Sequence, residues 1–235
     1  MAGKLEGRRV LITGVSRGVG LETAKKFLSE GAGLIGVARD PDRLGKAAAL
    51  LSALGDFQAL RADLEKEGSE EALVRAVEER WGALDLLVNN AAVMVFPGHL
   101  KNGDGGNLRL HLESNVLAPH RLIRALLPLL EKGREPRVLN VSSGAGCLDA
   151  MRAGDDIAAY RLSKWSLNGL TLLWSDTLKG RVAVNSFDPG WVKTDMGGPQ
   201  APGEPAQSAE GALALAVAPF GQTGKFWKDG LEIPF

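Results

Sequence analysis

Tyr160 and Lys164 lie four positions apart at the start of a long apolar segment, and their types and spacing suggest proton chemistry. On a helix this spacing places both side chains on one face. An adjacent ammonium favours the phenolate, so we expect the pKa of Tyr160 to fall from about 10 toward neutral. Such a tyrosine can exchange a proton with a substrate at working pH. The same spacing also arises by chance on helices, so other motifs must decide between the two interpretations.

A glycine-rich turn from Gly14 to Gly20 directly follows a short apolar run. Glycines at such a place let the backbone turn tightly and approach a pyrophosphate, while the following helix N-terminus attracts negative charge. The spacing G-x-x-x-G-x-G lacks the Gly-Lys-Ser/Thr ending of a triphosphatase loop. The turn therefore predicts dinucleotide binding, with a purely structural turn as the alternative.

The end of the next apolar run, Ala38-Arg39-Asp40, indicates which dinucleotide is bound. An acidic residue there favours the free ribose of NAD, whereas an arginine accommodates the 2′-phosphate of NADP. Arg39, with Arg17 from the glycine turn, predicts NADP(H) rather than NAD(H). The alternative is that both arginines are solvated surface charges and that Asp40 only caps a helix.

The elements that must position these residues alternate along the chain. Apolar runs predict strands at 9–13, 34–38, 57–60, 84–88, 137–141, 181–187 and 224–227. Helical periodicity predicts helices near 21–30 and at 41–54, 70–81, 108–130, 160–179 and 208–218, the last capped by Ser208. This pattern predicts an α/β Rossmann fold, a single domain over residues 1–235. Its doubly wound parallel sheet should have about seven strands and helices on both faces.

The composition excludes several classes of function. Lys plus Arg and Asp plus Glu are each 28, so the net charge of zero gives no footprint for nucleic acid or an anionic membrane. One cysteine and three histidines make a disulfide framework or a structural metal site unexpected. No signal peptide and no apolar run of about 18 residues is present, so we expect a cytoplasmic protein.

Together with two further motifs, Asn89-Asn-Ala-Ala92 and Ser142-Ser143, these features resemble the short-chain dehydrogenase/reductase family. The resemblance runs from about Leu5 to the C-terminus, and each motif falls where a predicted strand or helix places it at the carboxyl edge of the sheet. The segment 191–199 and the ending 224–230 look like the carbonyl-reductase-like branch of the family. That branch implies reduction of aldehydes or ketones with NADPH.

The resemblance implies a role for individual residues. Asn115 would hold a water that links Lys164 to solvent, and Ser143 would donate a hydrogen bond to the substrate carbonyl. Tyr160 would be the acid/base, and Lys164 would lower its pKa and bind the nicotinamide ribose. Asn89 would brace the central strands. The implied cofactor contacts are Gly14, Ser16, Arg17, Gly18, Val19, Gly20, Arg39, Asp63, Leu64, Asn90, Ala91, Ala92, Tyr160, Lys164, Pro189, Gly190, Val192 and Thr194.

The residues expected to line the substrate pocket are mostly apolar, which favours a hydrophobic carbonyl or alcohol substrate. They are Val93, Met94, Phe96, Cys147, Leu148, Trp191 and Met196. Cys147 has no histidine near it in sequence and is interpreted as a passive lining residue. The stretch 197–205, rich in glycine and proline, is interpreted either as a lid or as a rigid loop.

Two long helices should also bury apolar faces against another subunit, as they do in the family. Leu117, Leu122, Leu126 and Leu130 on one, and Leu167, Leu170 and Trp174 on the other, predict a dimer or tetramer. An extended epimerase or dehydratase shares the Tyr-Lys pair, but too few residues follow Thr194 for its second domain. A catalytically idle NADP-binding or scaffold protein on the same fold remains the alternative function.

Overall fold

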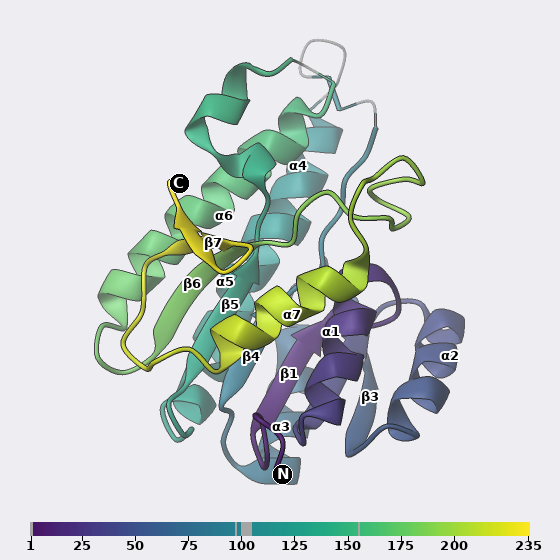
Figure 1. Cartoon of the computed structure of the whole chain (residues 1–235), viewed down its shortest axis with the longest axis vertical. Coiled ribbons are helices and arrows are strands. Elements are labelled where there is room, and N and C mark those ends of the chain that lie inside the picture. The colour runs from purple at the N-terminus through teal and green to yellow at the C-terminus, as the bar shows by residue number, and fades with distance from the viewer. Residues whose placement is uncertain (1, 97, 100–104, 155) are drawn as a thin grey trace.

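Eight strands lie side by side in one sheet in the computed structural model, which describes residues 2–96, 98–99, 105–154 and 156–235 (Figure 1). The order is β3-β2-β1-β4-β5-β6-β7-β8, so the chain starts at the centre and winds outward in both directions. The predicted doubly wound α/β fold is confirmed. The parallel strands are β1 (Arg9–Thr13), β2 (Gly33–Ala38), β3 (Phe57–Arg61), β4 (Leu86–Asn89), β5 (Arg137–Val141), β6 (Ala183–Asp188) and β7 (Phe226–Lys228).

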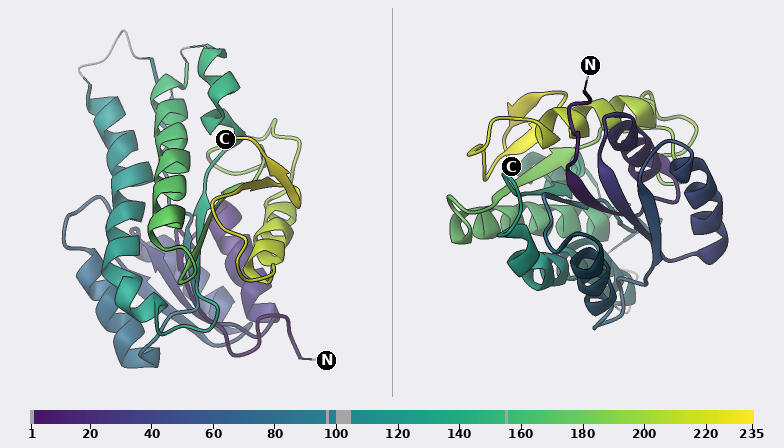
Figure 2. Two further views of the ribbon diagram at one scale, coloured as in Figure 1. Left: turned by 90° about the vertical axis from the view of Figure 1, so that its left-hand side faces the viewer. Right: turned by 90° about the horizontal axis from the view of Figure 1, so that it is seen from below.

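Helices cover both faces of this sheet, and Figure 2 shows the layers from the side and from below. One face packs against α1 (Gly18–Ser29), α2 (Pro41–Ser52) and α7 (Pro205–Ala216). The other packs against α3 (Glu70–Trp81), α5 (Ala118–Leu130) and α6 (Ala158–Thr177). In β1, Val10 and Ile12 enter the first core while Leu11 enters the second. A strand buried on both faces needs apolar residues throughout, which explains the uninterrupted apolar runs.

The sheet ends in an eighth strand, β8 (Leu231–Ile233), which pairs antiparallel with β7. The expectation of about seven parallel strands missed it. Asp229 and Gly230 join the two strands with φ of 50° and 76°. Two central residues with positive φ form a tight hairpin turn, for which Asp-Gly is a favoured sequence.

The helix expected over 108–130 is interrupted. The structure has α4 (Gly106–Leu112), a π-helical turn (Glu113–Leu117) and then α5. Pro119 has no N–H and cannot donate the regular helical bond to the carbonyl of Asn115. The ladder widens instead, and Ala118 N donates to the Glu113 carbonyl. The bulge contains Asn115, and π-bulges are frequent at functional sites.

Two other expectations about helices were wrong. Ser208 does not cap the last helix: α7 begins at Pro205 behind a capping box of Glu204 and Gln207, while the Ser208 hydroxyl donates to the Pro189 carbonyl.

Most residues assigned to a subunit interface lie in the hydrophobic core of the chain. Leu122, Leu126, Leu130 and Leu167 are at most 2% exposed, and Trp174 packs against the second core. Helical spacing cannot distinguish burial under a sheet from burial under a partner. The exposed apolar side chains on these helices are Leu117, Trp165, Leu172 and Leu173.

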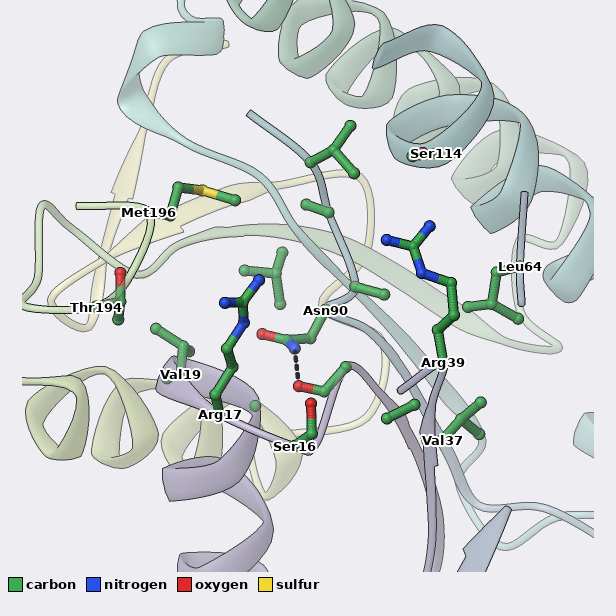
Figure 3. A pocket seen from close by; sticks show the side chains of 18 of the residues that line it. Ser16, Arg17, Val19, Val37, Arg39, Leu64, Asn90, Ser114, Thr194 and Met196 are labelled. Atoms are coloured by element: carbon green, nitrogen blue, oxygen red, sulfur yellow. Dashed lines mark hydrogen bonds between the residues drawn. The ribbon is translucent and has the colours of Figure 1, made fainter. Parts of the chain in front are cut away.

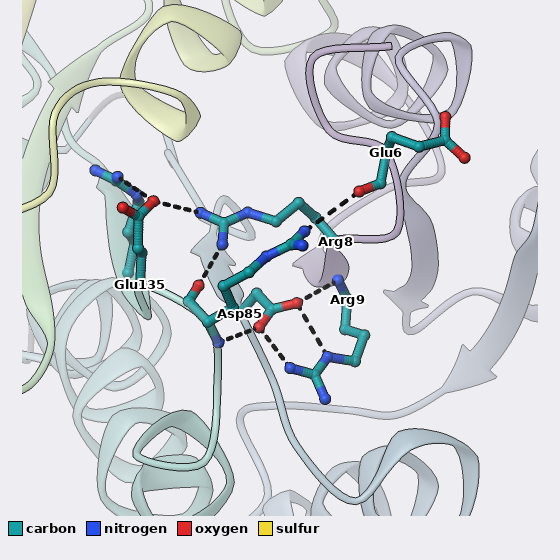
Figure 4. A network of polar contacts seen from close by, with 7 residues as sticks. Glu6, Arg8, Arg9, Asp85 and Glu135 are labelled. Atoms are coloured by element: carbon teal, nitrogen blue, oxygen red, sulfur yellow. Dashed lines mark hydrogen bonds and ion pairs between the residues drawn. The ribbon is translucent and has the colours of Figure 1, made fainter. Parts of the chain in front are cut away.

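A cluster of arginines and carboxylates joins the amino ends of the central strands (Figure 4). Asp85, 1% exposed, accepts from the Arg9 guanidinium at 3.0 and 2.7 Å and from Arg9 N at 2.9 Å. The backbone N–H of Arg134 also donates to it. The cluster therefore links β1 to the segments leading into β4 and β5, at the edge of the sheet opposite the carboxyl ends. No helix among the described residues is long and apolar enough to cross a membrane.

Candidate active site

A cavity of about 520 Å³ opens at the carboxyl ends of the parallel strands, and Figure 3 shows many of its side chains. This edge is where ligands bind in doubly wound sheets. Most of the residues expected to bind cofactor lie on its wall, together with two of those expected to bind substrate. They are Gly14, Ser16, Arg17, Gly18, Val19, Gly20, Arg39, Asp63, Leu64, Asn90, Ala91, Ala92, Val93, Tyr160, Lys164, Pro189, Thr194 and Met196.

The glycine turn is packed closely against the end of β4. A Cβ on Gly20 would lie 2.3 Å from Asn90 Nδ2 and from the Gly14 carbonyl oxygen, so no larger residue fits without displacement. Gly14 itself has φ of 75°, which favours glycine. Asn90 Nδ2 donates to the Thr13 carbonyl at 2.8 Å and to the Gly14 carbonyl at 3.3 Å, the second of which is drawn in Figure 3. The backbone N–H groups at the start of α1 are therefore held facing the cavity, where they suit an anionic ligand.

Three arginines line the cavity. Arg17 and Arg39 were predicted, and Figure 3 shows both side chains on its wall. Arg43, in the first turn of α2, was not predicted. Arg17 and Arg43 both contact the Asp195 carboxylate, and Arg39 pairs with Glu65 at 3.0 Å. All three guanidinium groups are at least half exposed, so a ligand phosphate could reach them. Asp40 does cap α2, accepting from Arg43 N at 2.9 Å.

Tyr160 and Lys164 share one face of α6, as predicted, and are 8% and 2% exposed. Lys164 Nζ lies 5.7 Å from the centre of the Tyr160 ring and donates to the Val141 carbonyl at 2.8 Å. The expected fall of the Tyr160 pKa toward neutral was wrong. Burial raises the pKa of Tyr160 to about 12, against a lowering by its hydrogen bond with Ser143. Burial also lowers the pKa of Lys164 to about 7, so the ammonium is itself destabilised.

Ser143 and Asn115 approach the pair from two other elements. Ser143 follows β5, and its Oγ accepts from Ala145 N at 3.1 Å while its hydroxyl lies within hydrogen-bonding reach of Tyr160. Asn115 is 1% exposed in the π-helical turn. Its Oδ1 accepts from Val93 N at 2.8 Å, and its Nδ2 donates to Ser163 Oγ at 2.9 Å. Its side chain thus ties the segment after β4 to α6.

A buried chain of hydrogen bonds braces the strands beneath the site. Asn89 Nδ2 donates to Asn140 Oδ1 at 2.8 Å, and Asn140 Nδ2 donates to Thr171 Oγ1 at 2.9 Å. Ser186 Oγ donates to the same threonine oxygen at 2.9 Å. The chain crosses β4, β5, α6 and β6, so it fixes α6 relative to the central strands. A connected buried network of this kind favours one arrangement of its elements.

Some predicted residues lie off the wall of the cavity. Gly190 and Val192 do not line it, and Val192 instead forms a bridge with Gly203. The expected substrate residues Met94, Phe96, Cys147, Leu148 and Trp191 do not line it either. Phe96, Leu148 and Trp191 are 67%, 63% and 61% exposed, whereas the Cys147 thiol contacts the Pro234 carbonyl. The start of the stretch 197–205 is fixed to Trp191, whose Nε1 donates to the Gly197 carbonyl at 2.8 Å.

Several residues that line the cavity were not predicted from the sequence. Arg43 stands four positions after Arg39, a spacing that could have marked it, but a charge on a helix is ordinarily solvated. Ser114 precedes Asn115 and donates to Glu65 Oε1 at 3.0 Å, a contact between distant segments that no local pattern reveals. The remaining missed residues of the wall are Val37, Ala38, Asp40, Ala62, Glu65, Val141, Ser142 and Asp195.

Comparison with known proteins identifies the family. A family model described as short chain dehydrogenase matches residues 8–205. The chain belongs to the short chain dehydrogenase family. A relative from Pseudomonas aeruginosa, named a 3-oxoacyl-acyl-carrier-protein reductase of rhamnolipid biosynthesis, is 36% identical over 82% of this chain and 75% of its own.

Two solved structures have the same fold as this short chain dehydrogenase. The NADPH-bound carbonyl reductase from chicken fatty liver superposes with a TM-score of 0.91 at 27% identity, over 98% of this chain and all of the other. The complex of Pseudomonas aeruginosa RhlG with NADP superposes with a TM-score of 0.86 at 33% identity, over 94% of each chain. The similarity therefore extends over nearly the whole short chain dehydrogenase.

Proposed function

We propose that this protein is an NADPH-dependent oxidoreductase that reduces an aldehyde or ketone to an alcohol. The observation that carries the proposal is one cavity lined by the glycine turn, three arginines, Tyr160 and Lys164. The arginines suit a ribose 2′-phosphate, and the turn suits a pyrophosphate. The similar carbonyl reductase and RhlG structures hold NADPH and NADP, which supports the same cofactor here.

The side chains divide the work of the reaction. Bound NADPH supplies the hydride. Ser143 and Tyr160 donate hydrogen bonds to the carbonyl oxygen, where negative charge develops, and Tyr160 delivers the proton. The high pKa of Tyr160 keeps it protonated before reaction. Burial lowers the pKa of Lys164 to about 7, and Lys164 binds the ribose beside the tyrosine. Asn115 holds the adjacent segment and α6 in register.

An apolar carbonyl compound is the substrate class that we propose. Val93 and Met196 line the cavity, and the segments 93–96, 147–152 and 191–203 carry the exposed apolar side chains Phe96, Leu148 and Trp191. Exposed apolar side chains on the segments that leave the cavity edge, together with apolar residues on its wall, favour binding of an apolar ligand. The test is a set of aldehydes and ketones of increasing chain length. A preference for short, charged carbonyl compounds would contradict this part of the proposal.

Replacing Tyr160 with Phe tests the proposed chemistry. Loss of the proton donor should lower the rate of NADPH oxidation about 10³-fold, within the range for general acid catalysis. NADPH affinity, measured by fluorescence titration, should change little. The matched control is Trp165→Phe, which alters an exposed position on the same helix. A wild-type protein that binds NADPH but reduces no carbonyl compound would favour the idle scaffold alternative.

The preference for NADPH over NADH is tested by the ratio of kcat/KM with NADPH to kcat/KM with NADH. The ratio should be well above one and should fall when Arg39 and Arg43 are both replaced by Ala, because NADH lacks the phosphate that they would contact. A higher wild-type efficiency with NADH would contradict the proposed cofactor.

We also propose self-association, as a dimer or tetramer, through the exposed apolar surface of the long helices. Trp165, Leu172 and Leu173 lie on α6, and Leu173 is 69% exposed. Light scattering should give an oligomeric mass at micromolar concentration for the wild type. Leu173→Glu should reduce that mass, whereas Leu50→Glu, on the exposed side of α2, should not. A monomeric wild type would refute the proposal. The expected cytoplasmic location stays a prediction.

A further inference from the structure

His111 is a fully buried titratable residue that the proposed chemistry does not use. It lies in α4, with an exposed fraction of 0%. Its Nδ1 lies 2.7 Å from the Asn107 carbonyl oxygen, and its Nε2 lies 3.2 Å from the backbone nitrogen of Val95. Its ring meets Tyr160 edge-on, with 6.3 Å between centres and 73° between planes.

These two partners fix the form of the imidazole. A carbonyl oxygen can only accept, so Nδ1 carries the proton. A backbone N–H can only donate, so Nε2 carries none. The ring is therefore neutral and in one tautomer, and each nitrogen is satisfied.

The contact between His111 and Val95 is one of two similar hydrogen bonds that attach the segment after β4 to the residues 111–115. Asn115, four residues after His111, accepts from Val93 N at 2.8 Å. His111 accepts from Val95 N, two residues further along an extended segment. Alternate N–H groups of this segment thus face one side of the helix. His111 in α4 and Asn115 in the π-helical turn hold the segment that runs from the cavity-lining Ala92 to the exposed Phe96.

We propose that His111 is a positioning residue, which holds the wall segment Val93–Phe96, of which Val93 lines the cavity, at a fixed separation from the Tyr160 ring. The inference rests on the proposed carbonyl reduction and deepens it. Asn115 alone fixes Val93, next to the cofactor. His111 extends that control to Val95, and so to the stretch leading to the exposed Phe96, which in this proposal meets the substrate.

The alternative is a histidine that only stabilises α4, through its contact with Asn107. Two substitutions separate these roles. In Gln the terminal amide reaches the position of Nε2 and can accept from Val95 N, whereas in Asn it reaches only the position of Nδ1 and can donate to the Asn107 carbonyl. If Val95 is the functional partner, Gln should preserve function and Asn should not. A purely structural role predicts the reverse order.

The experiment compares His111→Gln, His111→Asn and His111→Leu in the full chain. The Asn and Leu variants should raise the KM for the carbonyl substrate roughly tenfold, the effect of one lost hydrogen bond, and His111→Gln should stay within about threefold of wild type. NADPH affinity should stay within about twofold of wild type for all three, because Val95 does not line the cofactor cavity. The matched controls are His120→Gln and His120→Asn, since His120 contacts Trp174 in α6 and not the wall segment.

Hydrogen exchange provides a readout that does not depend on activity. The amide of Val95 should exchange faster in the Asn and Leu variants than in wild type and His111→Gln. Equal KM and equal exchange for the Gln and Asn variants, or protection retained only by Asn, would overturn the proposal. If wild type reduces no carbonyl compound, the proposed function fails, and the exchange pattern still decides whether His111 holds Val95. If the Leu variant does not fold, the Gln and Asn pair gives the answer.

Discussion

Asp188 places a buried carboxylate at the end of β6, near the Tyr160–Lys164 pair. It is 4% exposed, accepts from Gly190 N at 2.9 Å and lies 3.3 Å from Lys228 Nζ. Burial raises the pKa of Tyr160 and lowers that of Lys164, and the charge of Asp188 raises both. The carboxylate therefore helps to keep the tyrosine protonated and the lysine charged.

Asp188→Asn should lower the pKa of both groups. Reduction requires a protonated Tyr160 and a charged Lys164, so the alkaline limb of the kcat/KM profile should move to lower pH. The measurement is the pH profile of NADPH-linked reduction, with Glu232→Gln on exposed β8 as the control for loss of a carboxylate. An alkaline limb that stays in place, or moves to higher pH, would contradict this account.

At the residue scale, the sequence could predict which side chains come together but not their electrostatics. Tyr160, Lys164 and the glycine turn are recognisable because their chemistry requires a fixed local spacing. The pKa of Tyr160 was misjudged because burial outweighs the lowering by its hydrogen bond with Ser143, and because burial also lowers the pKa of the neighbouring Lys164. Burial depends on β5, β6 and the segments that follow them, which no four-residue spacing describes.

At the scale of elements, the segment from Trp191 to Gly203 carries Asp195 across to the cofactor arginines. Asp195 contacts Arg17 and Arg43, whose side chains are 56% and 51% exposed. Exposed pairs of this kind stabilise by only about 0.2–1 kcal/mol, so a phosphate can displace the carboxylate. The pairing nevertheless competes with a ligand phosphate for the same guanidinium groups.

Asp195→Asn should therefore tighten NADPH binding by about two- to fivefold, the range expected for releasing an exposed pair. NADH binding should hardly change, and the gain should shrink at high salt. Fluorescence titration of both cofactors checks this, with Asp149→Asn as a control at an exposed site away from the arginines. Weaker NADPH binding in the variant would show that Asp195 assists the cofactor instead of competing with it.

Most of the elements could be predicted, because parallel strands and their covering helices have distinct periodicities. The exceptions have local causes. Pro119 converts one expected helix into two helices joined by a π-helical turn, and Asp229-Gly230 adds a hairpin strand. Both signals are visible in the sequence. A proline early in a helix ordinarily marks its first turn, however, and a three-residue strand is too short to show alternation.

At the scale of the whole molecule, the Asp85 cluster holds the amino ends of the central strands. Burial raises the pKa of Asp85, but hydrogen bonds from Arg9 and Arg134 outweigh it and lower the pKa below the ordinary value. A carboxyl with a depressed folded pKa stabilises the fold above its unfolded pKa of about 3.9, and this contribution is lost as the pH falls through the folded value.

Asp85→Ala should lower the free energy of unfolding by about 3 kcal/mol at pH 7, because it leaves Arg9 without its buried partner. The difference from wild type should begin to narrow below about pH 4, where the unfolded chain binds the proton, and should vanish as the pH falls through the lower folded pKa of Asp85. Urea unfolding at several pH values measures both effects. Asp56→Ala, which removes an exposed partner of Arg80, should cost less than about 1 kcal/mol. Equal losses for the two variants would contradict the role assigned to Asp85.

The cluster around Asp85 and the cavity lie at opposite edges of the sheet, and this separation bears on how the protein can be redesigned. Segments 93–96, 147–152 and 191–203 all leave from the cavity edge, while the charged cluster holds the strands at the other edge. A library that randomises exposed positions such as Phe96, Leu148 and Trp191 would change few contacts that hold the strands together. Variants that reduce a new carbonyl compound could thus be selected without altering the sheet. The hydrogen bonds of Asn115 and His111 to the segment 93–96 would be the main constraint on such changes.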